Sequence, residues 1–122
     1  MNTVSIRIIS PENPDNTETV IAAADSQSDI EAIGINKIIY YKNKNQIRTD
    51  RKRITIGTGN GKIHVKDYVP IVIKAKNGAQ YTRKFWCLES LPTYEFLLGK
   101  HLLHRLGWEC RNRYDTVYSC PG

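Results

Sequence analysis

The stretch Thr19-Val20-Ile21-Ala22-Ala23-Ala24, followed directly by Asp25-Ser26-Gln27-Ser28, is the part of the sequence that decides the fold. From Val20 to Ala24 the residues are apolar at odd and even positions alike, which predicts a strand buried on both faces. The polar residues that follow cannot continue such a strand. The strand is therefore expected to end at Ala24 and to place Asp25 at the start of a polar loop.

Alternating apolar and polar residues predict further strands on both sides of this segment. Residues 4–8 alternate near the N-terminus. Val69–Ala75 and Tyr81–Leu88 form two more strands, with Pro70 marking a sheet edge or the first residues of its strand. Lys76-Asn77-Gly78-Ala79 between them has the residues of a hairpin turn. The chain is therefore expected to be built mainly from short strands joined by tight turns.

A second hairpin is predicted around a glycine-rich tip. Ile54–Ile56 and Lys62–Lys66 are short alternating segments, and three glycines lie within the five residues between them. The dipeptide Asn60-Gly61 is typical of a type I′ turn. The tip itself consists of Gly57, Thr58, Gly59, Asn60 and Gly61.

The apolar period changes near the C-terminus. Leu98, Leu102, Leu103 and Leu106 share one face at helical spacing, and Gly107 stands where it can cap the end of a short helix. The predicted fold is therefore all-β with one short C-terminal helix and barrel-like closure of the sheet. We expect one domain over residues 1–110, followed by a strand or tail over residues 111–122.

The charge of the chain is unevenly distributed. The 122 residues have a net charge of +6 and 40% hydrophobic residues. Residues 1–31 have one base and six acids, a net −5, whereas residues 41–53 have six bases and one acid, a net +5. We interpret residues 41–53 as an exposed, solvated loop. Nucleic acid is therefore not expected as a partner of this domain alone.

Other features restrict the class of protein. No apolar run approaches the roughly 18 residues that a membrane span needs, and the N-terminus does not resemble a signal peptide. The three cysteines are too few for a disulfide framework, and their odd number favours free thiols in an intracellular, reducing compartment. The histidines and cysteines fit no zinc spacing, so no metal or other cofactor is expected.

Three features taken together carry a family resemblance: the apolar strand that enters Asp25-Ser26-Gln27-Ser28, the glycine-rich hairpin tip, and Leu97-Leu98-Gly99-Lys100-His101-Leu102-Leu103 at the start of the helix. In this order and spacing, over about residues 3–110, the sequence resembles the retropepsins, the aspartic proteases of retroviruses and retrotransposons. The resemblance implies a barrel-like acid-protease lobe with a flap hairpin. It also implies a homodimer that cleaves extended peptides during polyprotein processing, in the cytoplasm or within a virus-like particle.

The resemblance also assigns roles. Asp25 would be the catalytic carboxylate, pairing with its copy in the partner around a water. Ser26 would bond across the dimer axis, with Gln27 and Ser28 completing the active loop. Asp29 and the flap tip from Gly57 to Gly61 would bind substrate. Asp29 would also pair with Lys100, more weakly than with an arginine, because lysine lacks the bidentate fork.

Gln27 departs from the family pattern, which has glycine at this position. A side chain there adds bulk beside the catalytic water and the substrate. A catalytically silent module with the same fold, which dimerises or binds peptide, therefore stays open as a second hypothesis. A small basic β-barrel that binds nucleic acid through residues 41–53 is a third.

Overall fold

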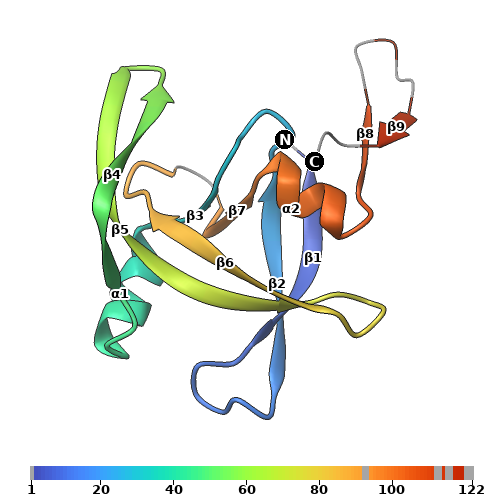
Figure 1. Ribbon diagram of the computed structural model, residues 1–122, viewed down its shortest axis with the longest axis horizontal. Helices are drawn as coiled ribbons and strands as arrows, with labels where there is room; N and C mark the ends of the chain where they lie inside the picture. Colours follow the sequence, from blue (N-terminus) through green and yellow to red (C-terminus); the bar gives the residue numbers. More distant parts are fainter. Residues whose placement is uncertain (1, 92–93, 112–113, 115–116, 120–122) are drawn as a thin grey trace.

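Strands dominate the computed structural model, which describes residues 2–91, 94–111, 114 and 117–119. Seven strands form one sheet in the order β1-β2-β7-β3-β6-β5-β4, and β1 also pairs with β5, so the sheet curves back on itself (Figure 1). The strands of this sheet are β1 Thr3–Ile9, β2 Thr17–Ala24, β3 Glu31–Ile33, β4 Arg48–Thr58, β5 Gly61–Lys74, β6 Gln80–Cys87 and β7 Phe96–Leu98. The prediction of a mainly β fold is therefore confirmed.

The described residues contain two helices, α1 Ile35–Asn43 and α2 Lys100–Arg105, and a separate two-stranded sheet of β8 Glu109–Arg111 and β9 Val117–Ser119. The expectation of a single helix was wrong. Among the residues of α1 only Tyr41 is buried, so its sequence lacks the broad apolar stripe that predicts a helix. In α2, Leu102 and Leu103 are fully buried, and Gly107 ends the helix with φ 75°, as predicted. None of the described helices is long and apolar enough to span a membrane.

Residues 41–53 are not the loop that their composition predicted. They comprise the end of α1, a turn with Asn45 at φ 56°, and the first part of β4. The strand pattern was hidden because the β4–β5 pairing is irregular: Thr49 pairs with Asp67, and the next pair is Ile54 with Val65. The segment is mostly exposed, but it belongs to the sheet.

The two segments predicted as separate strands around Asp67 are one long strand, β5. Figure 1 shows β5 running from the β4–β5 hairpin at one side of the molecule to the turn with β6 at the other. Pro70 pairs with Lys84 of β6 at a point beyond the last β4 pair and before the first β1 pair. Its missing N–H is tolerated there because no ladder partner faces its other side.

Turn predictions had mixed outcomes. The β5–β6 turn forms as predicted, with Gly78 at φ 87° and Asn77 Oδ1 accepting from the Ala79 N–H. The β4–β5 turn is not type I′ at Asn60-Gly61. Thr58 pairs with Gly61, so Gly59 and Asn60 are the central residues, and neither has the positive φ that this type needs. Thr58 closes the turn instead, because its hydroxyl donates to the Gly61 carbonyl at 2.9 Å.

Two apolar clusters lie among the described residues. The larger one includes Ile8, Phe85, Phe96 and Leu98, all at most 2% exposed. The smaller one consists of Ala23, Ala32 and Leu97, which are paired side by side across β2, β7 and β3. In β2 only Ala22, Ala23 and Ala24 are buried, and Ile21 is 54% exposed, so the strand is buried on both faces only at its end.

Candidate active site

Asp25 begins the loop that follows the buried end of β2. Its N–H donates to the Leu98 carbonyl at 2.9 Å, which extends the parallel pairing of β2 with β7 by one residue. Its Oδ1 accepts from the Gln27 N–H at 3.0 Å, and its carbonyl accepts from the Ser28 N–H at 3.1 Å. These bonds hold a half-buried carboxyl group at a defined point on the rim of the sheet.

The other side of the loop is joined to α2. The Ser28 carbonyl accepts from the N–H of Lys100, the first residue of α2, at 2.8 Å. The Ser28 hydroxyl donates to the Ile30 carbonyl at 2.9 Å. A Cβ on Gly99 would lie 2.5 Å from the Ile30 carbonyl oxygen and 2.7 Å from that of Ser28. Glycine is therefore required here, because the loop backbone passes too close for any side chain.

Glu31 lies beneath this junction and was not singled out in the sequence. It is 7% exposed, and its Oε2 accepts from the Gly99 N–H at 2.9 Å. Burial raises the pKa of this carboxyl, and the hydrogen bond from Gly99 opposes that effect. An acid between Ile30 and Ala32 in an apolar stretch was the only available signal. Glu31 therefore ties the start of β3 to the start of α2.

The predicted pair of Asp29 and Lys100 is present, with Lys100 Nζ 2.9 Å from Asp29 Oδ1. Lys100 lowers the pKa of the Asp29 carboxyl, first through this hydrogen bond and then through its charge. His101 Nε2 lies 4.0 Å from the same oxygen. Asp29 is 73% exposed, so water screens the pair and its main effect is to orient the loop.

A cleft of about 360 Å³ separates this loop from the β4–β5 hairpin. Asp25, Gln27, Ser28 and Asp29 line one side, and Gly57 with its two preceding residues lines the other. Of the predicted site residues, Ser26, Lys100 and the tip from Thr58 to Gly61 do not line it. The aliphatic lining was not predicted and consists of Ile30, Ala32, Ile56, Leu88 and Leu97.

The hairpin that borders the cleft is held near its tip only by bonds within the hairpin, among the described residues. The Asn60 N–H bonds to the Thr58 hydroxyl at 3.3 Å, and Thr55 Oγ1 lies 3.0 Å from His64 Nδ1 across the ladder. A Cβ on Gly57 or Gly59 would meet no atom within 4 Å. These two glycines therefore face open space.

The site as a whole is a carboxyl group at one wall of an apolar cleft, with backbone groups of a hairpin opposite. Among the described residues no group of three metal-ligating side chains is present. Such an arrangement can hold an extended peptide with apolar side chains beside a carboxyl group. Compared with models of known protein families and with curated protein sequences, the chain matches none of them.

Proposed function

We propose that the protein is a retropepsin-like aspartic endopeptidase that acts as a homodimer on extended peptide segments. The observation that carries the proposal is the position of Asp25, directly after the buried end of β2 and in the cleft that the β4–β5 hairpin borders. The curved main sheet, in which β1 also pairs with β5, supports a closed, barrel-like lobe of this type. Processing of a polyprotein is the corresponding role.

The chemistry needs two carboxyls, and one copy of this chain supplies one Asp25. In the proposed dimer the two Asp25 side chains face each other around a water. Like charges so close cannot both ionise, so one carboxyl stays protonated and the other acts as the base. The base takes a proton from the water, which attacks the peptide carbonyl, while the acid protonates the carbonyl oxygen. The amine then leaves without a covalent enzyme intermediate.

Other residues have supporting roles in this proposal. Ser26 links the two active loops across the dimer axis, and Asp29 holds the substrate backbone with Lys100 at its side. The flap pairs with the peptide as a strand would, through backbone bonds. The aliphatic cleft lining, including Ala32 and Leu97, favours apolar substrate side chains.

Gln27 determines whether the alternative holds. Its N–H keeps the bond to Asp25 Oδ1, so the extra side chain leaves the support of the carboxyl intact. That side chain is exposed and lines the cleft, where it takes space from the substrate. A silent module that binds peptide without cleaving it is therefore the second candidate, and this observation is what favours it.

The test is cleavage of denatured proteins by the parent chain, between about pH 4 and pH 7, with and without pepstatin. We expect pepstatin-sensitive cleavage that rises with dimer formation in sedimentation experiments. Asp25→Asn should abolish it. Asp15→Asn removes an exposed carboxylate from the β1–β2 loop, outside the cleft, and should leave the cleavage unchanged.

Three results would decide against the proposal. Absence of cleavage by a demonstrably dimeric parent would exclude the protease. Cleavage that appears only with Gln27→Gly would identify the silent module instead. Equal activity of the Asp25→Asn and parent proteins would mean that another group, or a contaminant, performs the reaction.

A further inference from the structure

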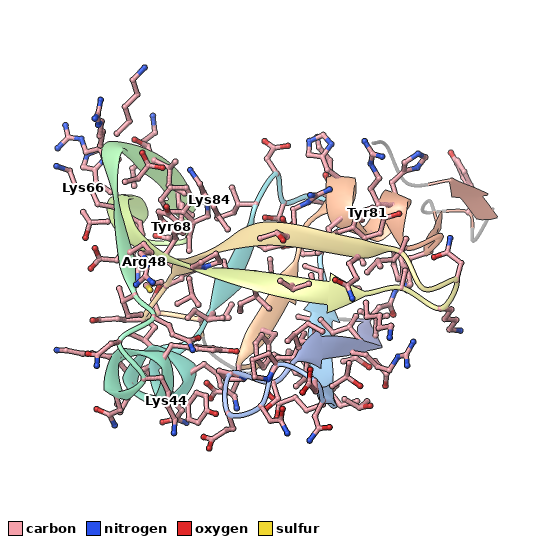
Figure 2. The ribbon with its side chains drawn as sticks, turned by 60° about the horizontal axis from the view of Figure 1, so that its bottom comes forward. Lys44, Arg48, Lys66, Tyr68, Tyr81 and Lys84 are labelled. Carbon is pink, nitrogen blue, oxygen red and sulfur yellow. The ribbon has the colours of Figure 1, made fainter. Side chains whose placement is uncertain are left out.

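Positive charge is concentrated at one end of the molecule, on residues that do not line the Asp25 cleft. Residues 41–66 have eight Lys or Arg and one acid, a net +7, which exceeds the +6 of the whole chain. Figure 2 shows Lys66, Lys84, Arg48 and Lys44 at the end where β4, β5 and α1 lie, with Tyr68 among them. We call this surface the basic face; it comprises Lys44, Arg48, Arg51, Lys52, Arg53, Lys66, Tyr68 and Lys84.

The middle of the basic face is an irregular stretch of β4. Because Thr49 pairs with Asp67 and Ile54 with Val65, the four residues 50–53 lie opposite the single residue Lys66. Three of these four are the exposed cations Arg51, Lys52 and Arg53. Like charges at such close spacing repel one another, and this repulsion does not help the folded chain. A bound polyanion would offset it.

The one acid in this stretch is already engaged. Asp50 Oδ2 lies 2.8 Å from Lys84 Nζ, and Lys84 lowers the pKa of Asp50. Lys84 is half exposed, so water screens the pair and the lysine can exchange the carboxylate for a phosphate at little cost. Among the described residues, the side-chain nitrogens of Arg51, Lys52 and Arg53 have no carboxylate within 4.0 Å, whereas Lys44 Nζ lies 2.8 Å from Glu12 Oε1 at the edge of the basic face.

Two aromatic rings, Tyr68 and Trp86, lie next to Arg48 and Lys84 on the same side of the sheet. Arg48, Tyr68 and Trp86 are direct register partners across β4, β5 and β6, so their side chains share one face. The Tyr68 and Trp86 rings are 5.4 Å apart, and Lys84 Nζ lies 4.8 Å from the centre of the Tyr68 ring. Tyr68 is half-buried, so part of its ring faces solvent.

We propose that the basic face binds single-stranded nucleic acid without strong sequence preference. Phosphates would contact Arg48, Lys66 and the cations of residues 51–53, and one base would stack on Tyr68. Strand faces that combine cations with an aromatic ring bind single strands in this way, because unpaired bases expose their rings while a duplex hides them. None of these residues lines the Asp25 cleft, so the inference is independent of proteolysis.

The tertiary structure changes what the net charge indicates. As a solvated loop, residues 41–53 supported nucleic-acid binding only as the third of three hypotheses. As part of a sheet, one of these cations, Arg48, stands in register with Tyr68 on the neighbouring strand, and Tyr68 pairs with Trp86 on the next strand, β6, which also carries Lys84. The structure therefore supplies the second ingredient, an aromatic ring beside the charge, that composition alone did not locate.

The test is fluorescence anisotropy with a labelled oligothymidylate of about 12 nucleotides, at salt concentrations from about 50 to 200 mM. We compare two matched double variants, each of which removes one Arg and one Lys. Arg51→Ser with Lys52→Ser changes the basic face. Lys76→Ser with Arg105→Ser removes exposed cations from the β5–β6 turn and from α2.

For the parent we expect Kd to rise steeply with salt, with a slope of about 0.7 per phosphate contact. The Arg51/Lys52 double variant should lower that slope by about 1.4 and weaken binding roughly ten-fold at low salt. The Lys76/Arg105 double variant should change Kd by less than about two-fold. Equal weakening by both would show that net charge alone attracts the oligonucleotide, and would overturn the proposal.

A second pair of variants tests stacking. Tyr68→Leu should weaken binding about ten-fold, whereas Tyr68→Phe, which keeps the ring, should bind as the parent does. Thermal unfolding checks that both variants fold, and if Tyr68→Leu does not, the charge variants still decide. Absence of binding at low salt would refute the inference. So would tighter binding to a duplex of equal length, to polyglutamate or to anionic lipid vesicles.

Discussion

Replacing Gly99 by alanine tests the contact that joins the Asp25 loop to α2. The added Cβ would lie 2.5 Å from the Ile30 carbonyl oxygen, where ordinary contacts begin at 3.4 Å, so the backbone must move by about 0.9 Å. Gly99 has φ −90° and ψ 176°, an extended conformation open to any residue, so the penalty is one of space and not of backbone dihedral.

The expected loss of stability in Gly99→Ala is the sum of the overpacking cost and the two hydrogen bonds that the shift would break. Overpacking costs about 1–3 kcal/mol, and the Lys100 N–H bond to Ser28 and the Gly99 N–H bond to Glu31 contribute about 1 kcal/mol each. The free energy of unfolding should therefore fall by about 3–5 kcal/mol. This is a large part of the roughly 5–15 kcal/mol that such a domain has.

Gly34 provides the matched control. It precedes α1 as Gly99 precedes α2, with φ −87° and ψ 179°, and its added Cβ would meet nothing closer than 3.4 Å. Gly34→Ala should cost at most about 1 kcal/mol. Urea unfolding of the two variants beside the parent measures the difference. If Gly99→Ala loses no more stability than Gly34→Ala, the close packing of the loop on Gly99 is not what holds it.

Three further outcomes follow from single side chains. Because burial raises the pKa of Glu31 above 4.5, its ionised form costs stability near pH 7 and that cost disappears as the pH falls toward 4.5. Glu31→Gln should therefore be more stable than the parent at pH 7 by a margin that shrinks on acidification, in thermal melts; a margin that grows would contradict the sign. Phe85→Ala, at a side chain that is fully buried and packed edge-on against Phe96, should cost about 3–5 kcal/mol in urea unfolding. A loss below about 1 kcal/mol would mean that the core refills the space. Burial raises the pKa of Cys87 to about 11, so mass spectrometry after iodoacetamide treatment should show slow alkylation of this thiol near pH 8 and faster alkylation as the pH approaches 11. Rapid alkylation near neutral pH would show that the thiol is more accessible than the structure has it.

Local patterns predicted the elements whose burial is regular. The strand that became β6, the turn around Gly78 and the helix end at Gly107 all agree with the structure, because period, turn chemistry and capping act within a few residues. The pattern failed at α1, whose exposed face includes apolar residues, and at β4. There the irregular stretch of residues 50–53 breaks the alternation that marks a strand.

The residues of the candidate site were likewise predicted in part. The resemblance pointed to Asp25 and to a pair of Asp29 with Lys100. In the structure Lys100 Nζ lies 2.9 Å from Asp29 Oδ1. Glu31 and the aliphatic lining of the cleft were missed. The role of Glu31 depends on its hydrogen bond from the N–H of Gly99, which is 68 residues away in the chain.

By itself the sequence determined that the chain is mainly β, that a buried strand ends at an aspartate and that a glycine-rich hairpin follows. Those properties depend on the spacing of neighbouring side chains. Only the tertiary structure decided that the loop of Asp25 rests on Gly99, that the β4–β5 hairpin borders a cleft with aliphatic lining, and that Arg48 lies in register with Tyr68. These depend on pairings between distant segments, whose register is set by the packing of the whole sheet.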